Sequence, residues 1–322
     1  MLKNSPGLLA LISCGVLISP IMSAAYAEPS LFGTAKLSVA AVDDDTGNAL
    51  SVSSHSSRVG IKGSSKTEAG LEIIYRFAWQ IDMTDEAKAS GDHIKSREQY
   101  VGLKDSWGEV RVGRHDTPYK TTGKKHVEFF SDSWADYNNI ISKPMDIRAD
   151  DSLSYYKSMD NLDFSVMYAA GDDTPAGDNI NDIISAKVEI QSGKLLLAAG
   201  FQDADQIGTG FKLVAGFGAD SSQFGLILEN VDPDGAGPSS TNLLASFKQK
   251  LDDTNTLKLA IGQADAAVAD DPLMLAAGID HKLNKATKVY ALLVIGRDNG
   301  LLADGKLVGD SSVAAVGIEA SF

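Results

Sequence analysis

The 322-residue chain carries 29 basic and 43 acidic side chains, which gives a net charge of −14 at pH 7. So large an acidic excess argues against nucleic acid as a partner, because surfaces that bind phosphate are built from lysine and arginine. The single cysteine, Cys14, excludes a disulfide within the chain and a metal site built from several cysteines.

The first 27 residues have the pattern of a secretory signal peptide. Lys3 supplies a positive charge, residues 8–21 are almost all apolar, and Ala25-Tyr26-Ala27 has the small-x-small form of a cleavage site. A lipoprotein cleavage box ending at Cys14 is the alternative, but it would leave an apolar region of only about five residues against the usual 7 to 15. Cleavage after Ala27 predicts one mature domain, residues 28–322, with a net charge of −15.

From Leu31 onward the side chains alternate with a period of two, the pattern of β-strands that have one apolar face. In the clearest stretch, residues 71–82, apolar side chains share one face, and Glu72, Arg76 and Gln80 lie on the other. After residue 27 no uncharged run reaches the roughly 18 residues that a membrane helix needs. The alternation predicts sixteen strands, over residues 31–40, 56–62, 71–82, 97–104, 109–115, 152–157, 162–169, 184–191, 195–202, 211–217, 223–229, 243–251, 257–262, 273–280, 289–296 and 312–322.

Tight turns and long polar loops alternate between these strands. Residues 192–194 are an example of a tight turn, and residues 297–310 of a long loop. Strands with one charged face, joined by short connections at one end only, are typical of transmembrane barrels, in which closure pairs every backbone group. The charged face carries too many lysines, arginines and glutamates for a packed core, but it suits a water-filled lumen. We therefore predict an all-β fold, a sixteen-stranded antiparallel transmembrane β-barrel.

The longest interval without alternation runs from Thr117 to Asp151. Charged residues are mixed there with Phe129, Phe130, Trp134 and Tyr137. This composition is too aromatic for a disordered linker, and a gap of this length inside a compact fold is usually functional. We predict a loop that folds inward into the mouth of the barrel and narrows its channel. The alternative is a surface excursion that contains a short helix.

Several blocks of the sequence resemble the trimeric general porins of Gram-negative outer membranes. Ser57 to Gly63 is similar to the second-strand signature of that family, and Ser96 to Leu103 with Val110 to Tyr119 resembles its fourth and fifth strands. The chain also ends in an aromatic residue, Phe322, as the family does. The resemblance implies a sixteen-stranded barrel, a homotrimer, a third loop folded into the pore, and a C-terminal signal read by the outer-membrane assembly machinery. The Pro-Glu-Phe-Gly-Gly turn of the enterobacterial loop is absent.

Two sets of charged residues are candidates for the pore constriction. The basic set lies on the lumen face by parity, and arginine stays charged in all conditions. It consists of Arg58, Arg76, Arg97 and Arg111. The acidic set recurs every four residues in the long loop, so a helical turn would place it on one face. It consists of Glu128, Asp132 and Asp136. The resemblance implies that loop acids oppose the arginines across the pore, and the alternative for both sets is ordinary solvated charge.

The sequence contains no catalytic or metal-binding pattern. None of the five histidines stands at metal-ligand spacing from another ligand, and no Gly-x-Ser-x-Gly element, phosphate loop or dinucleotide fingerprint occurs. A barrel phospholipase or protease would need a triad at its rim, and no motif favours one. We therefore predict no enzyme activity, no metal and no cofactor.

The predicted function is passive diffusion of small hydrophilic solutes and ions across the bacterial outer membrane. One alternative is a channel specific for sugars or anions, in which the aromatic residues of the loop stack on the solute. Another is a structural or adhesive barrel whose acidic loops bridge lipopolysaccharide through divalent cations. The net charge favours cations and the mostly basic lumen face favours anions. We give the lumen more weight, because the field is focused where the channel is narrow.

Overall fold

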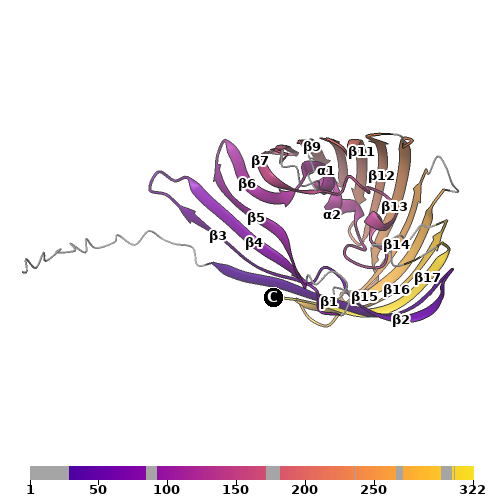
Figure 1. Ribbon diagram of the computed structural model, residues 1–322. Helices are drawn as coiled ribbons and strands as arrows, with labels where there is room; N and C mark the ends of the chain where they lie inside the picture. Colours follow the sequence, from indigo (N-terminus) through magenta and orange to yellow (C-terminus); the bar gives the residue numbers. More distant parts are fainter. Residues whose placement is uncertain are drawn as a thin grey trace, which may run out of the picture.

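The computed structural model describes residues 29–84, 93–171, 182–235, 237–265, 271–298, 307 and 309–322. The expected signal peptide lies outside these residues. A single antiparallel sheet curves on itself and closes where β1 (Ser30–Asp44) pairs with β17 (Ser311–Ser321) (Figure 1). The other strands are β2 (Gly47–Ser54), β3 (Arg58–Lys66), β4 (Glu72–Ile81), β5 (Ile94–Asp105), β6 (Gly108–Asp116), β7 (Arg148–Met159), β8 (Leu162–Ala169), β9 (Ile183–Ser192), β10 (Leu195–Ala204), β11 (Gly208–Gly218), β12 (Ser222–Pro233), β13 (Ser240–Lys250), β14 (Asn255–Ala264), β15 (Leu273–Lys282) and β16 (Thr287–Arg297).

The seventeen strand segments form sixteen barrel strands. Both β2 and β3 pair with β1, β2 along its second half and β3 along its first residues. They are therefore one barrel strand, interrupted at residues 55–57, where Ser56 has a left-handed φ of 52°. The prediction of a closed, sixteen-stranded antiparallel barrel is confirmed. The sequence pattern found only the β3 part of this strand, because β2 is rich in serine and alternates poorly.

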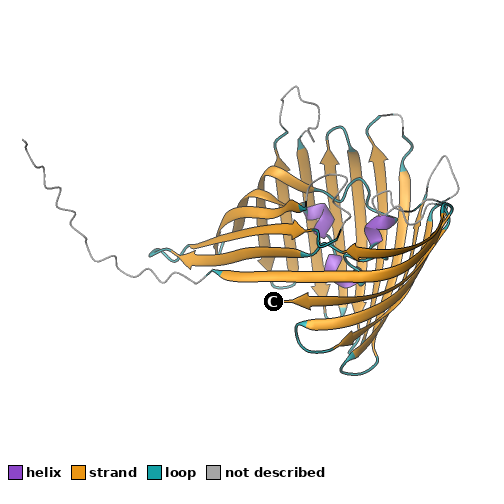
Figure 2. Cartoon of the chain, turned by 60° about the horizontal axis from the view of Figure 1, so that its bottom comes forward, coloured by secondary structure: helices purple, strands orange, loops and turns teal. Residues whose placement is uncertain are grey.

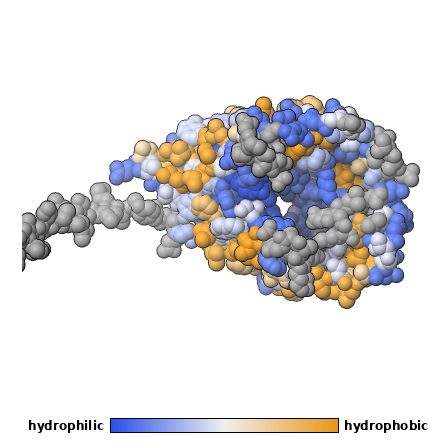
Figure 3. All heavy atoms as spheres, in the orientation of Figure 1, coloured by the Kyte–Doolittle hydropathy of each residue, from blue (hydrophilic) through white to orange (hydrophobic). Residues whose placement is uncertain are grey.

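The two faces of the barrel wall differ in polarity. On β4, Arg76 and Gln80 lie opposite Lys62 and Arg58 of β3, and these four share the inner face. The neighbouring Phe77 is exposed on the outer face. The view in Figure 3 is hollowed near its centre, with hydrophilic residues around the opening and hydrophobic residues gathered on the outer wall. A wall with an apolar outer face is the arrangement that lipid can surround.

Residues 117–147, which we call the inner segment, connect β6 to β7. They contain α1 (Pro118–Thr121), α2 (Lys124–Val127) and the 3-10 helix η2 (Tyr137–Asn139). Figures 1 and 2 show the helices within the curve of the sheet, where α1 contacts β8, β9 and β10 and α2 contacts β11, β12 and β13. In the part of the chain that the structure describes, no helix is long and apolar enough to cross a membrane.

The main apolar core lies between the inner segment and the inner wall, rather than between two sheets. Phe130, Trp134 and Ile140 of the segment belong to one buried cluster with apolar residues of β1, β10 to β13 and β15 to β17. Gly225 of β12 permits the close approach, because a Cβ at this position would come within 2.5 Å of Val127. The barrel is therefore partly filled by its own chain, which leaves a narrower water-accessible space beside the segment.

Candidate functional site

The base of the inner segment is fixed by Glu229, a buried carboxylate on the inner face of β12. Glu229 accepts hydrogen bonds from Tyr119 Oη at 2.6 Å and from the backbone N–H and the hydroxyl of Ser142, both at 2.7 Å. Asn242 Nδ2 donates at 3.1 Å, and Lys212 Nζ lies 3.4 Å away. A buried carboxylate with this many partners holds the segment in one position. We refer to these five residues as the base network.

The tip of the inner segment, residues 131–136, is held by β1 and β3. Lys36 Nζ donates to the backbone oxygen of Ser131 at 2.6 Å. Arg58 Nη1 and Asp132 Oδ2 form an ion pair at 3.0 Å, in which the two side chains keep 29% and 23% of their surface exposed. Water therefore still reaches the Arg58–Asp132 ion pair at the tip, whereas Trp134 of the tip is buried against the wall.

The three loop acids lie near one another, but not on a helix. Helix α2 ends at Val127, and Asp132 has a left-handed φ of 50°, so the shared helical face suggested by the four-residue spacing does not form. Asp136 instead caps η2, accepting hydrogen bonds from the backbone N–H groups of Asn138 at 3.0 Å and Asp132 at 2.6 Å. Aspartate side chains compete with helix formation in this way, because they bond to backbone groups nearby.

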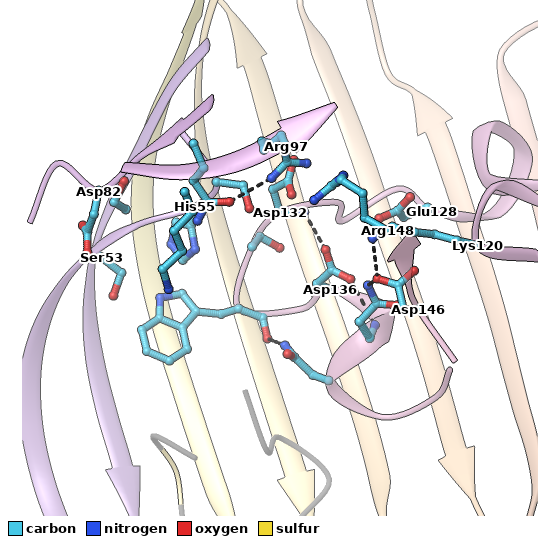
Figure 4. A pocket seen from close by; sticks show the side chains of 18 of the residues that line it. Ser53, His55, Asp82, Arg97, Lys120, Glu128, Asp132, Asp136, Asp146 and Arg148 are labelled. Atoms are coloured by element: carbon cyan, nitrogen blue, oxygen red, sulfur yellow. Dashed lines mark hydrogen bonds and ion pairs between the residues drawn. The ribbon is translucent and has the colours of Figure 1, made fainter. Parts of the chain in front are cut away.

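A cavity of about 700 Å³ lies beside the tip (Figure 4). It is bounded by the last residues of β2 and β4 and by the first residues of β5 and β7. Charges of both signs line it. The basic residues are Lys95, Arg97, Lys120, Lys124 and Arg148. The acidic residues are Asp82, Glu128, Asp132, Asp136 and Asp146. Among the residues that the structure describes, no group of three or more His, Cys, Asp or Glu is arranged to hold a metal ion. What this arrangement provides is a strong local field across a water-accessible space.

The four candidate arginines separate into two pairs. Arg97 lines the cavity and donates to Gln80 Oε1 at 2.8 Å. Arg58 does not line the cavity, but it forms an ion pair with Asp132, which does. Arg76 and Arg111 lie elsewhere on the inner wall, and neither lines the cavity. The structure thus brings Arg58 and Arg97 together with all three loop acids, and places the other two arginines apart from them.

Two cations at the ends of the inner segment also belong to the site, although no sequence pattern marked them as site residues. Arg148 Nη2 lies 2.9 Å from Asp116 Oδ1, and Lys120 Nζ lies 3.5 Å from Asp116 and 3.1 Å from Asp146. These residues meet because β6 and β7 pair Asp116 with Arg148 across the whole inserted segment. In the sequence, the opposite charges of Asp116 and Arg148 on either side of the insert were the one hint of this contact. They predict it only when the register of β6 and β7 is known.

Burial makes the loop acids titrate differently from free carboxyls. Burial, reinforced by the nearby Asp136, raises the pKa of Glu128 to about 8, although Lys124 Nζ lies only 3.1 Å away. Burial also raises the pKa of Asp136 to about 6, despite the two backbone N–H groups that favour its charged form. Burial opposes ionisation of Asp132 as well, but Arg58 outweighs it and lowers the pKa of this carboxyl. Near neutral pH, Asp132 is therefore the most fully charged acid at the tip.

The C-terminal residue, Phe322, closes the strand ladder at the seam of the barrel. Its backbone exchanges two hydrogen bonds with Gly33 of β1, at 3.0 and 3.1 Å. The aromatic ring lies over Gly33, where a Cβ would approach the ring to 2.3 Å. The residue as a whole remains 67% exposed. Phe322 thus contributes little to the lumen and presents its ring on the outside of the barrel.

Comparison with known proteins relates the chain to one family. A family model described as Gram-negative porin matches residues 15–299. The major outer membrane protein P.IB of Neisseria meningitidis serogroup B is 30% identical over 109 residues, a match that spans 31% of this chain and only 32% of the relative.

Solved structures resemble nearly the whole fold. An anion-selective porin from Comamonas acidovorans superposes with a TM-score of 0.79 at 21% identity, covering 92% of this chain and 100% of its own. The trimer form of OmpT from Vibrio cholerae gives a TM-score of 0.69 at 14% identity, with 92% and 100% of the chains covered. At these identities the structural likeness establishes the fold.

Proposed function

Because the chain belongs to the Gram-negative porin family, we propose that it forms a water-filled channel through which small hydrophilic solutes and ions diffuse passively. Family membership and the apolar outer wall of the closed barrel place the protein in the bacterial outer membrane. The observation that carries the proposal is the charged cavity beside the inner segment, inside the barrel. We further propose that the chain is not an enzyme and needs no cofactor.

The inner segment would act as the constriction of this channel. Asp132 and Arg58 meet at its tip, while Arg97 and Arg148 line the facing wall of the cavity. Charges opposed across a narrow space create a transverse field in which water and small polar solutes reorient and pass. An apolar solute would have to displace strongly hydrated groups without replacing their hydrogen bonds, so it is excluded.

A preference for anions is the finer proposal for the same constriction. Arg97 forms no ion pair with any residue that the structure describes, whereas Asp132 is neutralised by Arg58. Glu128 and Asp136 carry raised pKa values, so they contribute less than two negative charges at neutral pH. Five basic and five acidic residues line the cavity, so its lining carries a small positive excess when Glu128 is mostly protonated. The likeness to the anion-selective porin of Comamonas acidovorans is in keeping with this preference.

We also propose that the protein is exported by a cleaved signal peptide, residues 1–27, that the assembly machinery reads Phe322, and that it assembles as a homotrimer within lipopolysaccharide and lipid. OmpT of Vibrio cholerae has a trimer form. Outward pairs of small residues at the seam, Ala35 with Ala320 and Ala41 with Ala314, would let two walls approach closely. Gly33, which the sequence pattern placed in this patch, is covered by the ring of Phe322.

Planar bilayers test the proposed function directly. The purified full-length protein should produce stepwise conductance in KCl, and a salt gradient should give a reversal potential of the sign that indicates anion preference. Conductance with no ion preference would remove the anion proposal and leave the channel. Absence of conductance from heat-modifiable, folded protein would instead favour the adhesive barrel.

A further inference from the structure

The inner wall carries a second group of cations, near the tight turns and away from the cavity. Arg76 of β4 lies opposite both Lys62 of β3 and Tyr100 of β5, and Arg111 of β6 contacts the same Tyr100 ring. Arg111 of β6 is three residues beyond the turn that starts this strand, and it lies opposite Gly102 of β5. Neither arginine belongs to the constriction, so the proposed function leaves their position unexplained.

Aromatic rings fix both guanidinium groups. The Arg111 Cζ lies 4.6 Å from the ring centre of Tyr100 and 4.2 Å from that of Tyr156. The Arg76 Cζ lies 4.3 Å from the ring centre of Phe32. Such cation–π contacts hold the planar group in one orientation. The arginines of this wall are therefore less mobile than ordinary solvated side chains.

Each arginine uses only one nitrogen within the described part of the chain. The Nε of Arg76 lies 2.6 Å from Glu98, and the Nε of Arg111 donates to Glu109. No residue of that part accepts a hydrogen bond from the terminal nitrogens of either arginine, and the two side chains keep 25% and 23% of their surface exposed. The terminal N–H groups are thus free to face the lumen. Two carboxylates offset two guanidiniums, and Lys62 adds a positive charge beside them.

These contacts favour a particular class of solute. A guanidinium presents its N–H groups as a planar fork that matches the two oxygens of a carboxylate, whereas a spherical halide cannot use both prongs equally well. A fork already held by aromatic rings loses little conformational freedom when it binds. We propose that Arg76 and Arg111 form a binding station for small carboxylates, placed in series with the constriction on the turn side of the lumen. This inference rests on the proposed channel function.

The experiment compares permeability for acetate and for chloride in planar bilayers that contain the full-length protein. The double variant Arg76→Lys, Arg111→Lys keeps both charges and removes both forks. We expect the ratio of acetate to chloride permeability to fall about threefold to tenfold, the range for partly solvated charge-assisted hydrogen bonds. Conductance in KCl and the KCl reversal potential should stay as in the parent. Arg114→Lys is the matched control on the same strand, because Arg114 pairs with the exposed Asp150, and it should change nothing.

Two outcomes overturn the proposal. If the ratio of acetate to chloride permeability is unchanged in the double variant, the guanidinium forks do not select carboxylates. If the KCl reversal potential changes together with this ratio, the arginines act only through their electrostatic field. If the double variant does not fold, Tyr156→Leu replaces it, since loss of one ring frees the Arg111 fork and should lower the ratio by a smaller factor. Failure of the proposed function is distinct, because the parent would then conduct no KCl.

Discussion

The base and the tip of the inner segment are attached to the same barrel by opposite means. At the base, Glu229 has none of its side chain exposed, and Lys212 beside it has 1% exposed. At the tip, Arg58 and Asp132 keep about a quarter of their surface in contact with water. Different residues therefore fix the position of the segment and supply its charge. The buried network determines where the segment lies, and the wetter contacts leave charge available to solutes.

The free-energy cost of losing an ion pair should also differ between the base and the tip. Removing one partner of a buried ion pair costs about 3 to 5 kcal/mol, because the other charge stays buried without compensation. A solvent-exposed pair contributes about 0 to 1 kcal/mol, since water and salt replace much of the attraction. Changes at the base should therefore alter stability and pore size together, whereas changes at the tip should alter ion preference and leave the fold intact.

The largest effect is expected from Glu229→Leu. This change leaves Lys212 as a buried charge and removes the acceptor of Tyr119 and Ser142, so the free energy of unfolding should fall by about 3 to 5 kcal/mol. Release of the base should also raise conductance and make it noisier. Urea unfolding in detergent micelles measures the first effect and single-channel recording the second. Asp132→Asn is the matched control at the tip, because its ion pair with Arg58 keeps about a quarter of both side chains exposed, and its loss should cost about 0 to 1 kcal/mol. Equal losses in the two variants would remove the distinction between base and tip.

Deletion of residues 129–139 keeps the base network and removes the tip. Phe130 and Trp134, which fill the space beside the inner wall, are lost with it. We expect higher conductance and entry of larger sugars, which liposome swelling with sugars of graded size measures. The barrel strands contribute none of the deleted residues, so heat-modifiable folding should persist. A folded deletion variant with parental conductance and the parental size limit would show that the tip does not narrow the channel.

Reversing the charge of Arg58 and Arg97 together tests the tip alone. Glutamate at both positions should move the reversal potential strongly toward cations, because both residues lie beside Asp132 at the cavity. The shift should weaken from 0.1 M to 1 M salt, as the screening length falls from about 10 Å to about 3 Å. Stability should change by about 1 kcal/mol or less. Arg297→Glu is the control, since Arg297 pairs with Asp310 and is 54% exposed, and an equal shift there would indicate a diffuse field instead of a local one.

The sequence predicts the barrel wall better than it predicts the contacts of the inner segment. Alternation with a period of two is imposed by lipid on one face and water on the other, so strand number and closure followed from residue order alone. The interrupted strand at Ser56 and the base network did not follow. Glu229, Ser142 and Tyr119 are joined only through folding of the inner segment, and each looks like an ordinary polar residue in its own stretch.

For the candidate arginines, parity indicates a face of the barrel wall but gives no height along the barrel. Arg58 and Arg97 lie beside the tip, whereas Arg76 and Arg111 are several residues nearer the tight turns. Height depends on the stagger of neighbouring strands, including the irregularity between Phe77 and Trp79, where the β4–β5 register shifts. Alternation carries no information about that stagger.

The smallest effect should come from pH, and it isolates Glu128 and Asp136, the two candidate loop acids that are not bound to arginine. The pKa of Asp136 is raised to about 6 and that of Glu128 to about 8, so both are neutral at pH 5 and both are ionised at pH 9. Raising the pH through this window adds negative charge at the cavity, and anion preference should weaken in two steps. Lys124, which lies 3.1 Å from Glu128, and Arg58, bound to Asp132, keep their positive charge throughout the window and limit the size of the change. The reversal potential in a fixed KCl gradient, recorded from pH 5 to pH 9, measures both steps.

Glu128→Gln assigns the step at higher pH. Glutamine keeps the size of the side chain and cannot ionise, so only the step near pH 6 should remain, and the variant should retain anion preference at pH 9. Asp136 is a poorer choice for substitution, because its carboxylate also caps η2 through the N–H of Asn138. If Glu128→Gln reproduced the full two-step profile, the titrating group would lie elsewhere in the lumen. A flat profile in the parent would mean that the tip does not face the path of the ions, and the contrast between a buried base and a solute-facing tip would then fail at the tip.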